Sequence, residues 1–112
     1  MYVRWYMVTA TIFKNSQQYI SFKCEGHSGF ANHGEDIVCA AISMLTLNTA
    51  NSIMELTNSL INPIEKDGYL SWEFNNGIDD KAILLMDSMV LGLKTIEDTY
   101  SKRYLTLNIK EV

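Results

Sequence analysis

The chain has 112 residues, of which 47% are hydrophobic and 20% are charged. This length and composition predict a single folded domain over residues 1–112 with a hydrophobic core, and they exclude a disordered chain. The formal net charge of −4 argues against a nucleic acid as a direct partner, because proteins that bind nucleic acids carry a basic surface.

The sequence indicates neither secretion nor membrane insertion. It contains two cysteines, too few for a disulfide framework. The apolar N-terminus is interrupted by Arg4 and lacks the basic region and uninterrupted apolar run of a signal peptide. No run approaches the roughly 20 apolar residues that a membrane-spanning helix needs. We therefore expect a reducing, cytoplasmic setting and no membrane partner.

Two strands joined by a turn are predicted at the start of the chain. Residues 2–13 are rich in β-branched and aromatic side chains, which favour a strand. Residues 18–25 alternate, so that Ile20, Phe22 and Cys24 share one side. The polar stretch 14–17 between them is typical of a turn, and the two strands should form a hairpin.

The first helix is predicted to begin after Asp36 and to run to about Thr57. Asp36 is a suitable N-cap, because a short carboxylate accepts hydrogen bonds from the backbone N–H groups of the first turn. Pro63 then predicts a loop. After this loop, residues 69–74 alternate between apolar and polar side chains and are expected to form a strand.

The second helix is predicted to begin at Asp79 or Asp80 and to carry one apolar face. Leu84 and Leu91 fall outside that face, which indicates a second, partly buried surface. Residues 104–110 alternate as a final, half-buried strand. The order ββαβαβ predicts an α+β two-layer sandwich with a mixed or antiparallel sheet and both helices packed on one face. The other face is expected to be solvated or to pair with a second subunit.

Cys39 is the candidate nucleophile. With Asp36 as N-cap it becomes the third residue of the helix, where the helix dipole and the unpaired N–H groups favour a thiolate. Its own backbone N–H is then a natural donor to an oxyanion. The structural alternative is a buried cysteine that packs as a small hydrophobic residue. Ser43 lies one turn later on the same face and can bond near the sulfur or, more naturally, to a backbone carbonyl.

His27 is the candidate general base. It follows Gly26, which allows a sharp turn at the end of the second strand. The segment that follows is long enough to bring the imidazole back to Cys39, so the two form a nucleophile-and-base arrangement. His33 is the competing base, but it lies within the predicted loop and is better explained as a solvated side chain.

A metal site is another alternative. Cys24, His27, His33 and Cys39 offer two thiols and two imidazoles, which are ligand types that zinc prefers. Their spacing is not a usual zinc pattern, and core packing explains Cys24. The glycines form neither a P-loop nor a dinucleotide-binding motif. We therefore expect no metal and no cofactor.

A family resemblance rests on Gly26-His27 and on the run Asp36-Ile37-Val38-Cys39-Ala40-Ala41-Ile42-Ser43. Together with residues 55–57 and 89–97, this pattern resembles the ribosomal-processing cysteine protease family, called Prp. The resemblance implies a protease with a dyad of His27 and Cys39, supported by Gly26, Asp36 and Ser43.

The substrate that the resemblance implies is a short N-terminal extension on the large-subunit ribosomal protein numbered twenty-seven. Its removal, after an aromatic residue in an apolar segment, is needed for functional ribosomes. The resemblance also implies a homodimer with an α/β sandwich in each subunit.

The segment before the first helix is expected to act as a substrate flap. Gly29 and Gly34 would let it fold over an extended peptide, Phe30 would add apolar surface, and Ser28 and His33 complete it. The competing hypothesis is a non-catalytic module in ribosome assembly, which would hold a peptide through the same loop without cutting it.

Overall fold

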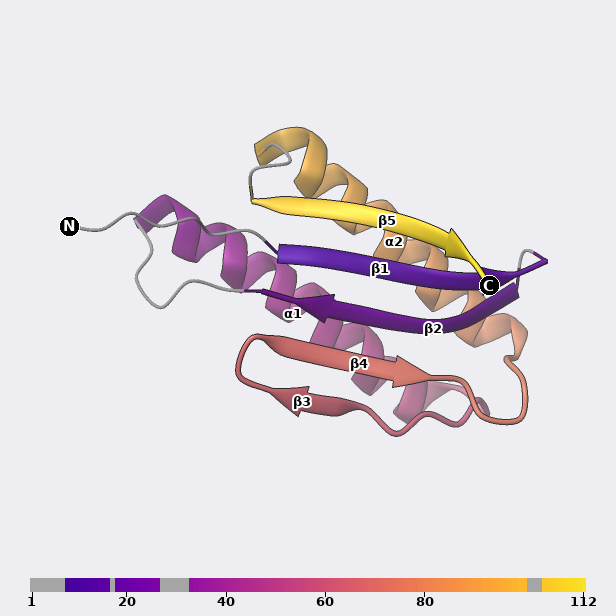
Figure 1. Cartoon of the computed structure of the whole chain (residues 1–112). Coiled ribbons are helices and arrows are strands. Elements are labelled where there is room, and N and C mark those ends of the chain that lie inside the picture. The colour runs from indigo at the N-terminus through magenta and orange to yellow at the C-terminus, as the bar shows by residue number, and fades with distance from the viewer. Residues whose placement is uncertain (1–7, 17, 27–32, 101–103) are drawn as a thin grey trace.

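The computed structural model describes residues 8–16, 18–26, 33–100 and 104–112, without the side chains of residues 33–36. Over these residues the elements follow the order ββαββαβ (Figure 1). They are β1 (Val8–Asn15), β2 (Gln18–Glu25), α1 (His33–Leu56), β3 (Ile64–Lys66), β4 (Tyr69–Glu73), α2 (Asp80–Tyr100) and β5 (Leu105–Glu111). The part of the first predicted strand before residue 8 lies outside the described residues.

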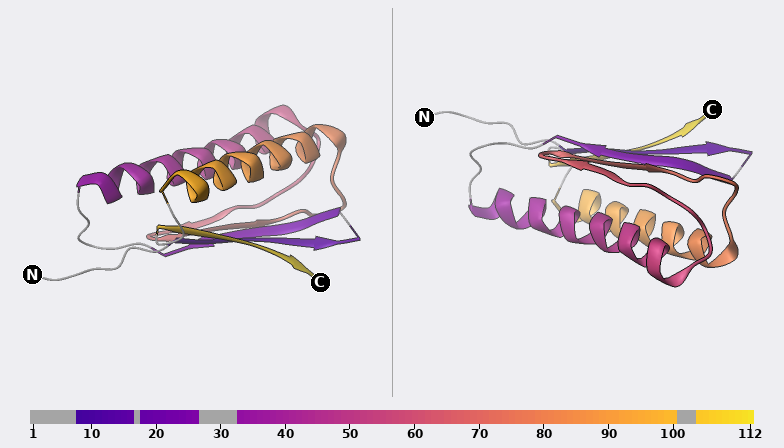
Figure 2. Two further views of the ribbon diagram at one scale, coloured as in Figure 1. Left: turned by 90° about the horizontal axis from the view of Figure 1, so that it is seen from above. Right: turned by 90° about the horizontal axis from the view of Figure 1, so that it is seen from below.

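The strands form one mixed sheet in the order β3-β4-β2-β1-β5. Strand β1 pairs antiparallel with β2 and parallel with β5, while β4 pairs antiparallel with both β2 and β3. Both helices cover the same face of this sheet (Figure 2). The predicted α+β two-layer sandwich with a mixed sheet is therefore confirmed.

Strand β3 is the element that the sequence analysis missed. It spans three residues, all exposed, in a stretch that was assigned to a loop after Pro63. Its pairing with β4 sets Glu65 opposite Leu70 and Lys66 opposite Tyr69. An exposed edge strand is held by these backbone hydrogen bonds. It therefore need not show the alternation of apolar and polar side chains by which strands are predicted from a sequence.

The core lies between the sheet and the two helices. Phe22 of β2 and Trp72 of β4 pack with ring centroids 4.7 Å apart. The predicted apolar face of the second helix is confirmed by its fully buried members, which are Ala82, Met86, Met89 and Leu93. The expectation of a second buried surface is wrong, since Leu84 and Leu91 are each 68% exposed. Each lies two positions, about 200° of helical rotation, from a buried residue.

Asp79 confirms the predicted start of the second helix. Its carboxylate accepts a hydrogen bond from the backbone N–H of Ala82 at 3.0 Å, which makes it the N-cap of α2. The same carboxylate accepts bonds from the Ser59 hydroxyl at 2.8 Å and the Asn58 N–H at 3.0 Å. One capping residue therefore also holds the segment that follows α1 against the start of α2.

Helix α1 contradicts the expectation that no stretch is apolar enough to cross a membrane. Among the described helices, its segment Ile37–Leu56 is sufficient by length and composition, with a mean hydropathy of 1.5. In the structure, however, Ile42 and Ile53 are buried in the core of the domain. A Cβ added to Gly92 of α2 would lie 2.8 Å from Leu45 Cδ2, so the two helices also approach closely. Packing inside the domain thus accounts for the buried side of α1, whereas Ile37, Met44 and Leu56 of the same segment are exposed.

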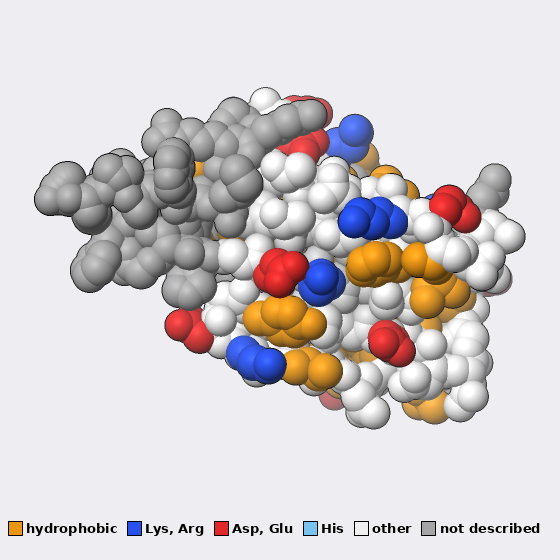
Figure 3. Space-filling view, viewed as in Figure 1, with side chains coloured by type: hydrophobic (Ala, Val, Ile, Leu, Met, Phe, Trp, Pro, Cys, Tyr) orange, Lys and Arg blue, Asp and Glu red, His pale blue; other side chains and the backbone are white. Residues whose placement is uncertain are grey.

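The sheet face opposite the helices carries apolar side chains interspersed with lysine or arginine and with acidic residues (Figure 3). Lys23 and Glu25 of β2 form an ion pair with an N–O distance of 3.3 Å. Such a mixture is typical of solvent-exposed surface, of which apolar atoms normally form a large part. Pairing of this face with a second subunit stays a prediction.

Candidate active site

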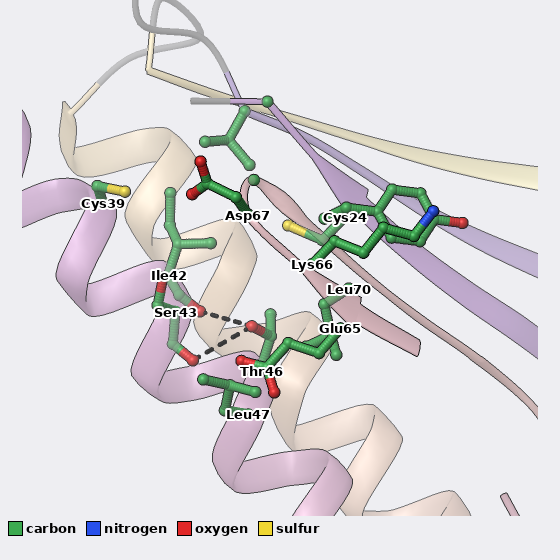
Figure 4. Close-up of a pocket in the computed structure, with 14 residues that line it drawn as sticks. Cys24, Cys39, Ile42, Ser43, Thr46, Leu47, Glu65, Lys66, Asp67 and Leu70 are labelled. Carbon is green, nitrogen blue, oxygen red and sulfur yellow. Dashed lines mark hydrogen bonds between the residues drawn. The ribbon is translucent and has the colours of Figure 1, made fainter. Parts of the chain in front are cut away.

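A pocket opens where the second to fourth turns of α1, the end of β2 and the β3–β4 turn meet (Figure 4). Its volume is about 230 Å³. The residues that line it are Val8, Cys24, Gly26, Cys39, Ile42, Ser43, Thr46, Leu47, Glu65, Lys66, Asp67, Gly68, Tyr69 and Leu70. Three residues singled out from the sequence, Gly26, Cys39 and Ser43, therefore belong to one pocket.

Cys39 is half-buried, and its Sγ points from α1 into the pocket (Figure 4). The prediction of a helix that starts after Asp36 is wrong, because α1 begins at His33. Cys39 consequently lies in the second turn. The helix dipole acts mainly in the first turn, and only the first four N–H groups of a helix lack partners within it. Two expectations about Cys39 are therefore wrong: that the helix dipole favours its thiolate, and that its backbone N–H is free to donate to an oxyanion.

Cys24 faces the same pocket from β2 but has a different environment (Figure 4). It is 8% exposed. Burial, followed by the nearby Cys39 and Glu25, raises the pKa of the Cys24 thiol to about 12. Cys24 is therefore a protonated packing residue near neutral pH, as its place in the alternating strand predicted.

Gly26 places the end of β2 at the pocket. Its φ of +116° is a conformation that favours glycine, in agreement with the predicted sharp turn. Its N–H donates a hydrogen bond to the carbonyl oxygen of Gly68 at 2.9 Å. The chain continues from this anchored glycine directly into His27.

Several predicted site residues lie outside the described residues, namely His27, Ser28, Gly29 and Phe30. His33 and Gly34 belong to the first turn of α1 and not to the predicted loop. The role of residues 28–34 as a substrate flap stays a prediction. Asp36 is also helical, and its proposed support of the site stays a prediction.

Ser43 is exposed at the pocket edge. Its carbonyl oxygen accepts a bond from the Thr46 hydroxyl at 3.3 Å, and the same hydroxyl donates to Ile42 at 2.9 Å (Figure 4). These bonds satisfy the buried Thr46 hydroxyl within α1, one turn after Cys39. A role for the Ser43 hydroxyl itself stays a prediction.

Asp67 is one of the pocket residues that sequence reasoning missed. The sequence analysis gave it no role in the site, and a turn-forming Asp-Gly pair carries no signal beyond its local conformation. In the structure, its carboxylate points toward Cys39 across the pocket (Figure 4). Within the described residues, no three His, Cys, Asp or Glu side chains are grouped to hold a metal ion.

These features define a class of protein: a small α+β domain in which a half-buried thiol opens into a pocket at the end of a strand, as in thiol-dependent enzymes. Comparison with known proteins gives the family. The chain belongs to the cysteine protease Prp family, whose model matches residues 7–105.

Individual relatives agree with this assignment. The chain is 36% identical over 101 residues to the ribosomal processing cysteine protease Prp of Bacillus subtilis, covering 84% of this chain and 90% of the relative. It is 30% identical over 107 residues to that of Staphylococcus aureus, covering 93% and 100%.

The fold also matches solved structures of the S. aureus protease. Its complex with a substrate peptide superposes with a TM-score of 0.84 at 28% identity, covering 93% of this chain and 100% of the other. Its complex with a covalently linked product peptide gives a TM-score of 0.82 at 29% identity, with the same coverage. The protein is therefore a cysteine protease, and the alternative of a non-catalytic binding module is not supported.

Proposed function

We propose that this protease removes the short N-terminal extension of the large-subunit ribosomal protein numbered twenty-seven, with Cys39 as nucleophile and His27 as general base. The observation that carries the proposal is the pocket that Cys39 of α1 shares with Gly26, the residue directly before His27 in the sequence. The names of the relatives support a ribosomal protein as the substrate.

The reaction follows from the chemistry of the two groups. The imidazole of His27 takes the thiol proton, and the thiolate of Cys39 attacks the scissile carbonyl carbon. The resulting tetrahedral intermediate collapses as the imidazolium protonates the leaving amine, which leaves a thioester on Cys39. Water, deprotonated by the imidazole, then hydrolyses the thioester and restores the thiol. The covalently linked product peptide on the S. aureus relative is consistent with such a thioester route.

The pocket fits part of a peptide better than a whole small molecule. Its volume of about 230 Å³ is below the roughly 300 Å³ at which small-molecule sites begin. Ile42, Leu47 and Leu70 supply an apolar wall, whereas Glu65 and Asp67 lie on the polar side. This composition supports an apolar residue of the substrate held beside Cys39, with the rest of the extension lying outside the pocket.

The proposal includes two further expectations, a cytoplasmic location and a homodimer. A cytoplasmic location agrees with a thiol nucleophile that must stay reduced. Light scattering coupled to size-exclusion chromatography tests the assembly, since a monomer mass at micromolar concentration would contradict the dimer.

The function is tested by incubating the purified protein with the extended ribosomal protein and identifying the new N-terminus by mass spectrometry. We expect one cut after an aromatic residue of the extension. Cys39→Ala should abolish it, whereas Cys24→Ala, a change of the same kind in the same pocket, should retain it. Cleavage by folded Cys39→Ala would remove Cys39 from the mechanism, and no cleavage by the wild type would refute the substrate.

A further inference from the structure

Glu65 points into the pocket from the edge of the sheet. It lies on β3, directly opposite Leu70 of β4, and residues that are paired in this way project on the same face. Because Leu70 is buried on the face that the helices cover, the Glu65 side chain is also directed toward α1. Figure 4 shows its carboxylate at the level of Thr46 and Leu47. An edge strand thus presents a negative charge to the pocket.

This charge is not neutralised by the part of the protein that the structure describes. Among the described residues, no ion pair or hydrogen bond engages the Glu65 carboxylate. The neighbouring cation, Lys66, alternates to the other side of β3, and its ammonium lies 5.3 Å from the centroid of the Tyr69 ring. Lys23 is paired with Glu25. The end of the pocket that Glu65 lines therefore favours a cationic group.

The pocket extends along α1 from the nucleophile to Glu65. The residues of α1 that line it recur every three or four positions and so share one face of the helix, namely Cys39, Ile42, Ser43, Thr46 and Leu47. At a rise of 1.5 Å per residue, Thr46 and Leu47 lie about 10–12 Å along the helix axis from Cys39. An extended peptide advances by roughly 3.3 Å per residue. A peptide that lies along the pocket therefore brings its third or fourth residue from the cut to the level of Glu65.

We propose that Glu65 is a specificity-determining residue, whose carboxylate binds the Lys or Arg side chain that lies three or four residues from the scissile bond. This inference rests on the proposed function. A ribosomal protein binds RNA and is therefore rich in Lys and Arg, so a substrate of this class supplies the cation. The apolar stem of such a side chain packs along Leu47 and Leu70, while its charged head reaches Glu65 at the exposed rim.

A structural role for the same charge makes a different prediction. A charged side chain that points inward from an edge strand hinders pairing of that strand with another molecule. Loss of the Glu65 charge would then increase aggregation and leave the choice of substrate unchanged. The two roles are separated by measuring sequence preference, which edge protection does not affect.

The test uses peptides that span the cleavage site of the extended ribosomal protein, with Lys or Gln placed in turn at each of four positions on either side of the cut. We expect Lys at the third or fourth position on one side to lower the KM of wild type about threefold to tenfold relative to Gln, with little change in kcat. Glu65→Gln should abolish this difference. Glu73→Gln should retain it, because Glu73 is exposed on the opposite face of the same hairpin and does not line the pocket.

Charge reversal gives a second measurement on the same peptides. Glu65→Lys should favour Glu over Gln at the position where wild type favours Lys, and both preferences should weaken as salt is added. A preference for Lys that persists in Glu65→Gln or in Glu65→Lys would overturn the proposal, as would its absence from wild type.

The outcome for Glu65 can be told apart from the outcome for the proposed substrate. A mixture of peptides of random sequence, with the products identified by mass spectrometry, reports the preference without the ribosomal sequence. If wild type leaves the ribosomal peptides intact but its cuts in the mixture favour Lys in a manner that depends on Glu65, only the proposed substrate is refuted. If it cuts the ribosomal peptides with equal KM for Lys and Gln at every position, only the role of Glu65 is refuted.

Discussion

The backbone N–H of Gly26 donates a hydrogen bond to the carbonyl oxygen of Gly68 at 2.9 Å, which joins the end of β2 to the β3–β4 turn. Cys39 lies in the same pocket. The bond links two glycines with φ values of +116° and +73°. The position at which the chain enters His27 is thus determined by a turn that lies far along the sequence.

This relationship predicts that Gly26→Ala damages both the fold and the activity. An L side chain at a φ of +116° is strained, with an expected cost of about 1–3 kcal/mol in the free energy of unfolding. Displacement of His27 should also lower kcat. Gly77→Ala is the control, because Gly77 has a φ of +93°, and a Cβ added there meets no other atom within 4 Å. Denaturant titration should show a loss of stability in both variants, while cleavage assays should show a loss of kcat in Gly26→Ala alone.

The two thiols should differ in their reaction with iodoacetamide. Burial raises the pKa of the Cys24 thiol to about 12, so the reactive thiolate of Cys24 is scarce until the solution is strongly alkaline. Cys39 opens into the pocket and should be labelled first near neutral pH. Peptide mapping after timed alkylation checks this order. Equal, slow labelling of both residues would argue against an activated Cys39.

The two histidines should differ in the cleavage assay. His27→Ala removes the proposed base and should lower kcat by a factor of about 10² to 10⁴. His33 begins α1, so His33→Ala should mainly affect the end of the helix and leave kcat within a few-fold of wild type. A greater loss of kcat in His33→Ala than in His27→Ala would reverse the assignment of the base.

Asp79 should make stability depend on pH in the acidic range. Hydrogen bonds from the backbone N–H groups of Asn58 and Ala82 and from the Ser59 hydroxyl lower the pKa of this carboxyl. A carboxyl whose pKa is lower in the folded state stabilises that state above its unfolded pKa, about 4 for aspartate, and the contribution is lost as pH falls through the folded pKa.

Asp79→Asn tests this dependence because asparagine also caps helices but does not titrate in this range. Unfolding free energy measured from neutral pH down to about pH 2 should fall more steeply for wild type than for the variant below about pH 4. Parallel curves would show that another carboxyl carries the acid sensitivity.

The sequence by itself determined those features that depend on local patterns. The alternation that buries Phe22 and Cys24, the apolar face from Ala82 to Leu93 and the Asp79 cap each follow from a few neighbouring residues, and together they predicted the α+β sandwich. The predicted place of Ile20 on the same side as Phe22 is wrong, because the β1–β2 register shifts there, so that Tyr19 is buried and Ile20 is exposed. Gly26 and Cys39 were found in the same way, from a strand end and the motif around the first helix.

Only the tertiary structure decided the features that depend on pairing between distant segments. Strand β3 exists through its backbone bonds to β4, and Asp67 reaches the pocket because β4 pairs with β2 in one particular register. The true start of α1 at His33 moved Cys39 out of the first turn, although Gly34 and Asp36 are poor helix formers, so local preference alone does not set this start. Register and helix start are set by cooperative interactions over many residues, and no short motif encodes them.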